Sequence, residues 1–118
     1  RFFRALASAV RGDCEPLDAL VAGTSARDEW IARWTHRRAG DVRAADEIAD
    51  AMDCTNPVYI PRNHLVEEAL EAATAGDLGP FERLVDVLAS PYAERPGLDR
   101  YAQPAPPEFG RHRTFCGT

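Results

Sequence analysis

The stretch NPVYIPRNHLVEEALEAATAGDLGPFERLVDVLASPY, residues 56–92, decides the predicted fold. After its opening prolines, apolar residues recur at the three- and four-residue spacing of amphipathic helices. Gly76 is a natural helix end, and Gly79-Pro80 is a natural helix start. Because only about four residues join the two helical patterns, we expect an antiparallel helix pair. Its predicted apolar face consists of Leu65, Val66, Ala69, Leu70 and Ala73, followed by Phe81, Leu84, Val85 and Leu88.

The sequence before this stretch also has helical periodicity. Residues 1–10 predict a helix, and a short second helix follows Pro16. Ser25 with Asp28 resembles a capping box, which predicts a helix from there to about Arg38. The apolar stripe of the first helix is predicted to be Phe2, Phe3, Leu6 and Val10.

One more amphipathic helix is predicted before the quoted stretch. Val42, Ala45, Ile48, Ala49 and Met52 are spaced to form its apolar face. Asn56-Pro57 should end this helix, because proline disfavours the helical conformation of the residue before it. The fold class is therefore all-α, with about five to six helices within residues 1–89.

Residues 90–118 differ from the preceding residues in proline content and in periodicity. Five of the nine prolines lie at or after Pro91, and helical periodicity is lost. Aromatic residues recur in this segment, although disordered tails are usually poor in them. We therefore expect an extended C-terminal tail that lies along a folded surface and is anchored by Tyr92, Tyr101, Phe109 and Phe115.

Composition narrows the class of protein and its partners. At 118 residues the chain is long enough for one domain, and its formal net charge of −5 argues against a nucleic acid or an anionic membrane as the main partner. Its apolar runs are much shorter than the ~20 residues that span a bilayer. The cysteines, Cys14, Cys54 and Cys116, form no C-x-x-C motif and are odd in number, which favours reducing cytosol. The chain starts inside a helical pattern without methionine, so we expect a segment of something longer.

Arg62, Asn63 and His64 are candidate functional residues. They follow the extended segment PVYIP and enter a helix, where polar side chains and backbone N–H groups can converge on an anion. The same residues could instead tie the helix start to a neighbouring element. The second interpretation, a structural role, is the one that we favour.

Other chemical groupings are weaker. Glu67, Glu68 and Glu71 cluster in sequence, but such carboxylates are typical of a solvated helix surface near the positive end of the helix dipole. His112 and Cys116 are four apart, yet no second pair completes a metal site, and we predict no metal ligands in this segment. The sequence contains neither a phosphate-binding P-loop nor a kinase H-R-D or D-F-G motif. It also lacks lysine, so no lysine here can contact ATP phosphates.

Several of these segments together resemble the C-terminal end of the selenoprotein O family, also called SelO or YdiU. They are the block NP-x-Y-I-P-R-N-H at residues 56–64, the Gly76-Asp77 break, Ser90-Pro91-Tyr92, and the ending TFCGT at residues 114–118. The resemblance runs from about Trp30 to Thr118 and more loosely from Phe2. It covers only the last quarter or so of a typical family member.

The resemblance implies a fold and an activity for the longer protein. The family has a protein-kinase-like fold that holds ATP in reversed orientation, and it transfers AMP to hydroxyl side chains of proteins with Mg²⁺ or Mn²⁺. Residues 1–89 would then be C-lobe helices, and the partners would be the upstream part of the same kinase-like domain and the protein substrates. No position here matches the family's catalytic or metal-binding residues, so we expect no catalytic residue, no cofactor and no activity in this segment alone.

The resemblance also assigns a role to Cys116. It matches a cysteine near the chain end that some members replace by selenocysteine and that can form a disulfide with a cysteine near the active site. We therefore expect a redox role for Cys116, with its disulfide partner upstream of this chain; Cys14 or Cys54 could substitute only if folding brings one within about 6 Å of it, Cα to Cα. The competing hypothesis for the whole segment is a non-enzymatic helical module that binds a partner protein.

Overall fold

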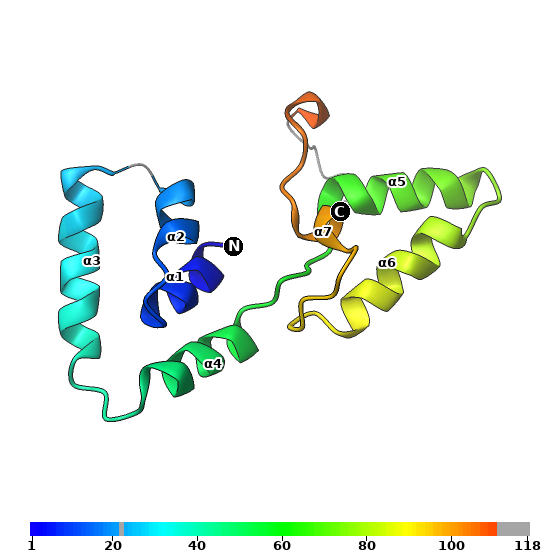
Figure 1. Cartoon of the computed structure of the whole chain (residues 1–118). Helices are drawn as coiled ribbons and strands as arrows, with labels where there is room; N and C mark the ends of the chain where they lie inside the picture. The colour runs from blue at the N-terminus through cyan, green and yellow to red at the C-terminus, as the bar shows by residue number, and fades with distance from the viewer. Residues whose placement is uncertain (22, 111–118) are drawn as a thin grey trace, which may run out of the picture. The chain divides into compact units, whose positions relative to one another are not determined.

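The computed structural model describes residues 1–21 and 23–110, and all regular structure in these ranges is helical (Figure 1). The predicted all-α class is confirmed, while the kinase-like lobe stays a prediction. The chain divides into two compact units, Arg1–Asn56 and Pro57–Thr118. The boundary predicted at Ser90 between the helical segment and the tail falls inside the second unit. Among the described residues, no helix combines the length and apolar character needed to cross a membrane.

The first unit is built around its first helix. Helix α1 (Phe2–Val10) contacts both α2 (Glu15–Leu20) and α4 (Ala45–Thr55). Leu6 is almost completely buried, since it packs with Ala5 and Leu17. The same helix turns Ala7 and Val10 toward Ile48 and Ala49 of α4. The three- and four-residue spacing in the sequence therefore predicted Leu6 and Val10 of α1 correctly but missed Ala5 and Ala7.

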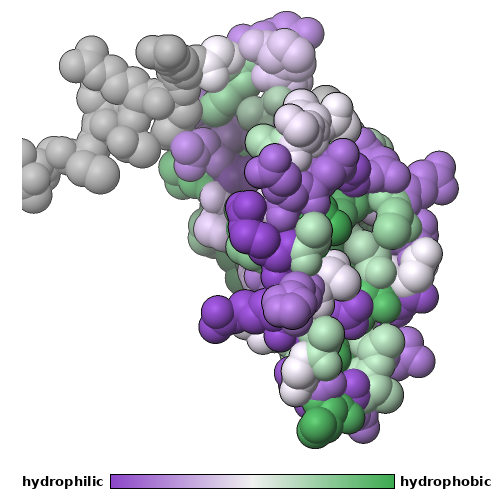
Figure 2. Space-filling view, turned by 90° about the vertical axis from the view of Figure 1, so that its left-hand side faces the viewer, coloured by the Kyte–Doolittle hydropathy of each residue, from purple (hydrophilic) through white to green (hydrophobic). Residues whose placement is uncertain are grey.

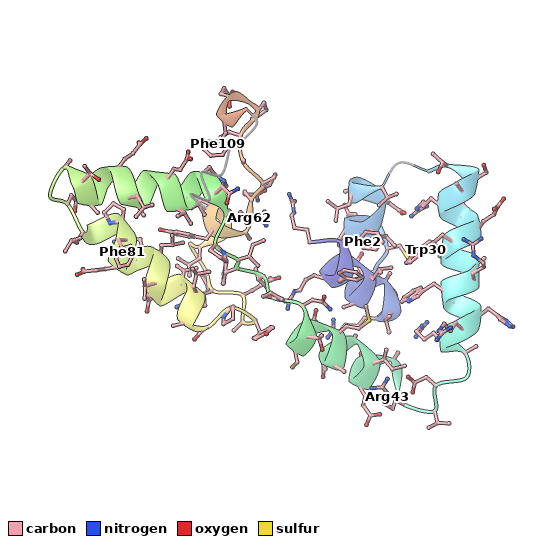
Figure 3. The ribbon with its side chains drawn as sticks, turned by 180° about the vertical axis from the view of Figure 1, so that it is seen from behind. Phe2, Trp30, Arg43, Arg62, Phe81 and Phe109 are labelled. Atoms are coloured by element: carbon pink, nitrogen blue, oxygen red, sulfur yellow. The ribbon has the colours of Figure 1, made fainter. Side chains whose placement is uncertain are left out.

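Helix α3 (Ser25–Arg38) differs from the others, because none of its described residues is buried. It touches the rest of the unit through an ion pair of Arg27 with Asp18 of α2 and through one aromatic face. The rings of Phe2 and Trp30, labelled in Figure 3, lie 5.7 Å apart, and Trp30 stacks on Trp34 at 6.2 Å. Ile31 and Trp34 also pack against the α1–α2 core. The predicted helix bounds are confirmed.

Three predictions in the first unit were wrong. Phe3 is exposed, because it is rotated by about 100° from Phe2, which faces Trp30. Val42 is fully exposed and precedes α4, where Asp41 and Arg43 form a turn. The cap of α3 is Thr24, whose hydroxyl accepts a hydrogen bond from the backbone N–H of Arg27 at 3.2 Å. Thr24 has the extended backbone that an N-cap requires, whereas the predicted cap, Ser25, is already helical.

The second unit contains the predicted helix pair, α5 (Asn63–Thr74) and α6 (Gly79–Ala89), which contact each other and are joined by a short turn (Figure 1). Gly76 ends α5 with φ at +93°, a conformation that suits glycine. The N–H groups of Gly76 and Asp77 donate to the carbonyls of Ala73 and Ala72, the bonding pattern of a Schellman motif. The Asp77 carboxylate then accepts from the N–H of Gly79 at 2.9 Å and so starts α6.

The core of this unit joins both helices to segments on either side of them. Its buried residues are Tyr59, Leu65, Ala69, Leu84, Val87 and Tyr101. Val87 was missed from the predicted apolar face. Leu70, Phe81 and Val85 were included in that face but are exposed by 53%, 45% and 52%. The buried side of α6 is rotated toward Leu84 and Val87, where Tyr59 and Tyr101 provide the contacts.

The described part of the tail, residues 90–110, was predicted to be extended, and this is wrong in two places. It contains helix α7 (Asp99–Ala102) and a 3₁₀ turn at Pro107–Phe109. Tyr101 is buried in the core as the anchoring prediction required, whereas Tyr92 is exposed. Phe115, the last predicted anchor, lies outside the described residues.

Candidate functional site

The segments of the second unit that carry the family resemblance, residues 56–64 and 90–92, meet at the start of α5. The segment Pro57–Pro61 has no helix, and the N–H groups of Val58 and Tyr59 both donate to the carbonyl of Pro91, at 2.8 and 3.2 Å. The NPVYIP and SPY motifs, more than thirty residues apart in the sequence, are therefore joined by backbone hydrogen bonds. Such bonds satisfy N–H groups that an extended segment cannot satisfy by itself.

Arg95 connects this junction to the end of α6. Its backbone N–H donates to the hydroxyl oxygen of the buried Tyr59 at 2.9 Å. Its guanidinium donates to the carbonyls of Val87 at 3.0 Å and Asp86 at 3.2 Å, and it lies 3.3 Å from the Asp86 carboxylate. These carbonyls belong to the last turn of α6, where backbone acceptors lack helical partners and positive charge is favoured. Sequence reasoning missed Arg95; an arginine that closely follows a helix end was the available signal.

The predicted trio Arg62, Asn63 and His64 lies at the N-terminus of α5. Arg62 is the N-cap residue, and its guanidinium donates to the carbonyl of Ala102 at the end of α7, at 2.9 Å. The His64 ring contacts the Phe109 ring edge-on, with 5.7 Å between centroids. Figure 3 shows Arg62 and Phe109 beside the start of α5. Asn63 is exposed.

These contacts support the structural interpretation of the trio. Two of its three side chains hold the start of α5 to the tail, one through a hydrogen bond and one through an aromatic contact. These contacts engage the Arg62 guanidinium and the His64 imidazole, which are the groups that would bind an anion. An anion-binding role remains a prediction.

The three glutamates of α5, Glu67, Glu68 and Glu71, do not form one cluster. Glu68 pairs with Arg100 of α7 at 2.6 Å. Glu67 and Glu71 line a shallow, open hollow on the surface of α5, together with Leu70 and Thr74. Within residues 1–21 and 23–110, no three His, Cys, Asp or Glu side chains are grouped closely enough to hold a metal ion. His112 and Cys116 lie outside the described residues, whereas Cys14 and Cys54 are exposed thiols.

The clearest electrostatic perturbations lie on the surface of the first unit. The Arg43 guanidinium hydrogen-bonds the Asp41 carboxylate and lowers the pKa of Asp41 from 3.8 to about 2. Hydrogen bonds from Arg11 to Asp50 and Asp53 on α4 raise the pKa of Arg11 above its usual value. Both shifts are caused by ion pairs, one in the segment before α4 and one between the end of α1 and α4, and neither creates a group that titrates near neutral pH.

Comparison with known proteins shows to which class of protein this chain is similar. No family model matches the chain. The chain is 56% identical over 117 residues to the protein nucleotidyltransferase YdiU of Mycobacterium sp. (strain KMS), a match that covers 99% of the chain and 23% of the relative. It is 55% identical to the protein of the same name from Pseudarthrobacter chlorophenolicus and 49% identical to that from Chromobacterium violaceum, covering 22% and 25% of those relatives.

The chain is thus homologous to proteins named as nucleotidyltransferases. The resemblance to the YdiU family predicted from the sequence motifs is confirmed along nearly the whole chain. The chain spans about a quarter of the length of the curated relatives it matches.

Proposed function

We propose that this chain is the C-terminal part of a protein adenylyltransferase, an enzyme that transfers AMP from ATP to hydroxyl side chains of proteins. The observation that carries the proposal is the 56% identity to a protein nucleotidyltransferase over 99% of the chain. The longer protein would use ATP with Mg²⁺ or Mn²⁺ in the cytoplasm. Its partners would be its protein substrates, and this segment would bind the upstream part of the same kinase-like domain.

The role that we propose for the segment itself is structural. The NPVYIPRNH motif makes its polar contacts with Pro91, Arg95 and Ala102, which are all parts of its own unit. Because the described residues group no three His, Cys, Asp or Glu side chains around a common point, the protein ligands of the Mg²⁺ would lie in the remainder of the longer protein. The segment alone is expected to be inactive.

We further propose that Cys116 senses redox state in the longer protein. Cys116 belongs to the TFCGT motif at residues 114–118, and its counterpart in the family can form a disulfide. A regulatory thiol has to be accessible to oxidant and to a partner thiol. Cys14 and Cys54 are exposed and provide matched control positions.

The proposal is tested by measuring transfer of labelled AMP to protein. The 118-residue chain and the longer protein that contains it are each incubated with labelled ATP and Mg²⁺, with and without reductant. Labelling by the longer protein alone is expected, and a reductant dependence that Cys116→Ser abolishes but Cys54→Ser retains would support the redox role. A folded, metal-loaded longer protein that incorporates no label would contradict the adenylyltransferase assignment.

A non-enzymatic helical interaction module is the second candidate. The exposed apolar side chains of Leu70, Phe81 and Val85 favour it, because such residues often mark binding surfaces. A self-sufficient module is expected to be a compact monomer, whereas a part of a larger domain should associate through its apolar surfaces. Light scattering of the purified chain distinguishes the two.

A further inference from the structure

The α5–α6 pair has one apolar edge that the described residues leave exposed. In α5, Leu70 follows the buried Ala69 by one position and is therefore rotated by about 100° from it. In α6, Val85 follows the buried Leu84 in the same way. Because the two helices are antiparallel and face each other, the same rotation in each leads to the same side of the pair. Phe81 lies one turn before Val85 and extends this edge.

The tail occupies the opposite edge. Glu68 precedes Ala69 and is rotated the other way around α5, and it pairs with Arg100 of α7 at 2.6 Å. Tyr101, the neighbour of Arg100, is buried against the helices from that side. The exposed edge, which we name the hairpin face and define as Leu70, Phe81 and Val85, is thus separate from the surface that the tail covers.

The surroundings of the hairpin face are acidic. Glu67 and Glu71 border Leu70 in the shallow hollow on α5, and Glu82 lies beside Phe81 on α6. Glu71 and Glu82 are exposed and make no ion pair with any residue that the structure describes. Figure 2, which is viewed from the side on which Figure 1 draws α3, shows hydrophobic residues between hydrophilic ones on the surface of the first unit and not the hairpin face. An apolar centre with a carboxylate border fits an occupant with apolar side chains beside arginine or lysine.

We propose that the hairpin face binds a basic amphipathic helix from the remainder of the longer protein. The relatives are roughly four times as long as the match, since it covers 23% of them, so most of such a protein lies outside this chain. Helix packing favours a helical occupant, because the groove between two antiparallel helices accepts the ridge of a third. A basic side chain of this helix enters the hollow on α5 and pairs with Glu71. The inference rests on the proposed function only in taking the chain as part of a protein of YdiU length.

Site-specific photocrosslinking in the longer protein tests this. A benzoylphenylalanine is placed at Phe81 or Val85, and as a matched control at Arg83, which is exposed on the same helix but rotated by about 200° from Phe81. Both face positions are expected to crosslink, within one molecule, to the same arginine- or lysine-containing helix outside residues 1–118, and the control is not. Crosslinks between molecules, crosslinks confined to residues 1–118, or none from either face position would overturn the proposal.

The charge of the occupant is tested separately. Glu71→Arg is expected to lower the Phe81 crosslink yield severalfold, and Glu71→Gln to lower it less, because only the first places like charges together. Equal yields in all three proteins would refute a basic occupant. Neither readout depends on AMP transfer, so a longer protein that crosslinks as expected but transfers no AMP would remove the proposed function and leave this inference standing.

Discussion

Replacing Tyr59 by phenylalanine removes one oxygen atom from the junction of the family-like segments. The Tyr59 side chain is 3% exposed, and its hydroxyl oxygen accepts the backbone N–H of Arg95 at 2.9 Å. Without the hydroxyl, this partly buried N–H has no replacement acceptor within the described contacts. Leaving a buried donor unsatisfied costs about 1–3 kcal/mol, and partial access of water to Arg95 places the expected loss at about 1–2 kcal/mol.

The assay is hydrogen–deuterium exchange of the α5 and α6 amides, read by mass spectrometry. A loss of about 1–2 kcal/mol should speed exchange through unfolding of this unit by about 5–30-fold. Tyr101→Phe is the matched control, since Tyr101 is also buried but its hydroxyl makes no hydrogen bond with a described residue. Unchanged exchange in Tyr59→Phe, or equal acceleration in both variants, would refute the reasoning that this hydrogen bond holds the junction.

Three further predictions concern single residues. Leu6→Ala should destabilise the first unit by about 2–5 kcal/mol in urea unfolding followed by tryptophan fluorescence, whereas the half-exposed Leu20→Ala should change little; equal effects would contradict the assigned core. Gly76→Ala should cost about 1–2 kcal/mol, seen as faster exchange at the end of α5, because a side chain strains the +93° φ angle although no atom lies near its Cβ position; an unchanged rate would contradict the turn geometry. Asp41 should titrate by NMR near pH 2, and Arg43→Gln should move the midpoint toward 3.8: the lowered pKa means that the ion pair's contribution is present above about pH 4 and is lost as the pH falls through 2, so a wild-type midpoint near 3.8 would argue against the pair.

The helix boundaries could be predicted because their causes are local. Gly76 with Asp77 ends α5, and Asn56-Pro57 ends α4, through backbone effects that act within a few residues. The all-α class follows from the same short-range periodicity.

The buried side of each helix was less predictable, because periodicity identifies an apolar stripe and not its neighbour. Leu70 and Val85 belong to such stripes, yet Tyr59 and Tyr101 arrive on the other side and bury Val87 instead. These contacts join residues that are distant in the sequence.

The candidate site was predictable in position but only partly in composition. The block at residues 56–64 was singled out correctly as the place where polar residues gather. The partners of Arg62 and Tyr59 lie about forty residues onward in the tail, at Ala102 and Arg95; the position of Arg95 just after α6 could indicate a helix cap, but no local pattern indicated its pairing with Tyr59. An arginine that caps a distant helix looks in sequence like any solvated charge.

The central claim, that the chain belongs to an enzyme which transfers a nucleotide to protein, is tested most directly by the position of the label in ATP. The longer protein is incubated with its protein targets, Mg²⁺, and ATP labelled either at the α-phosphate or at the γ-phosphate. Protein-bound label is expected from the α-phosphate only, because the transferred AMP retains that phosphate and the β- and γ-phosphates leave as pyrophosphate. Label from the γ-phosphate alone would identify a phosphotransferase and rule out AMP transfer.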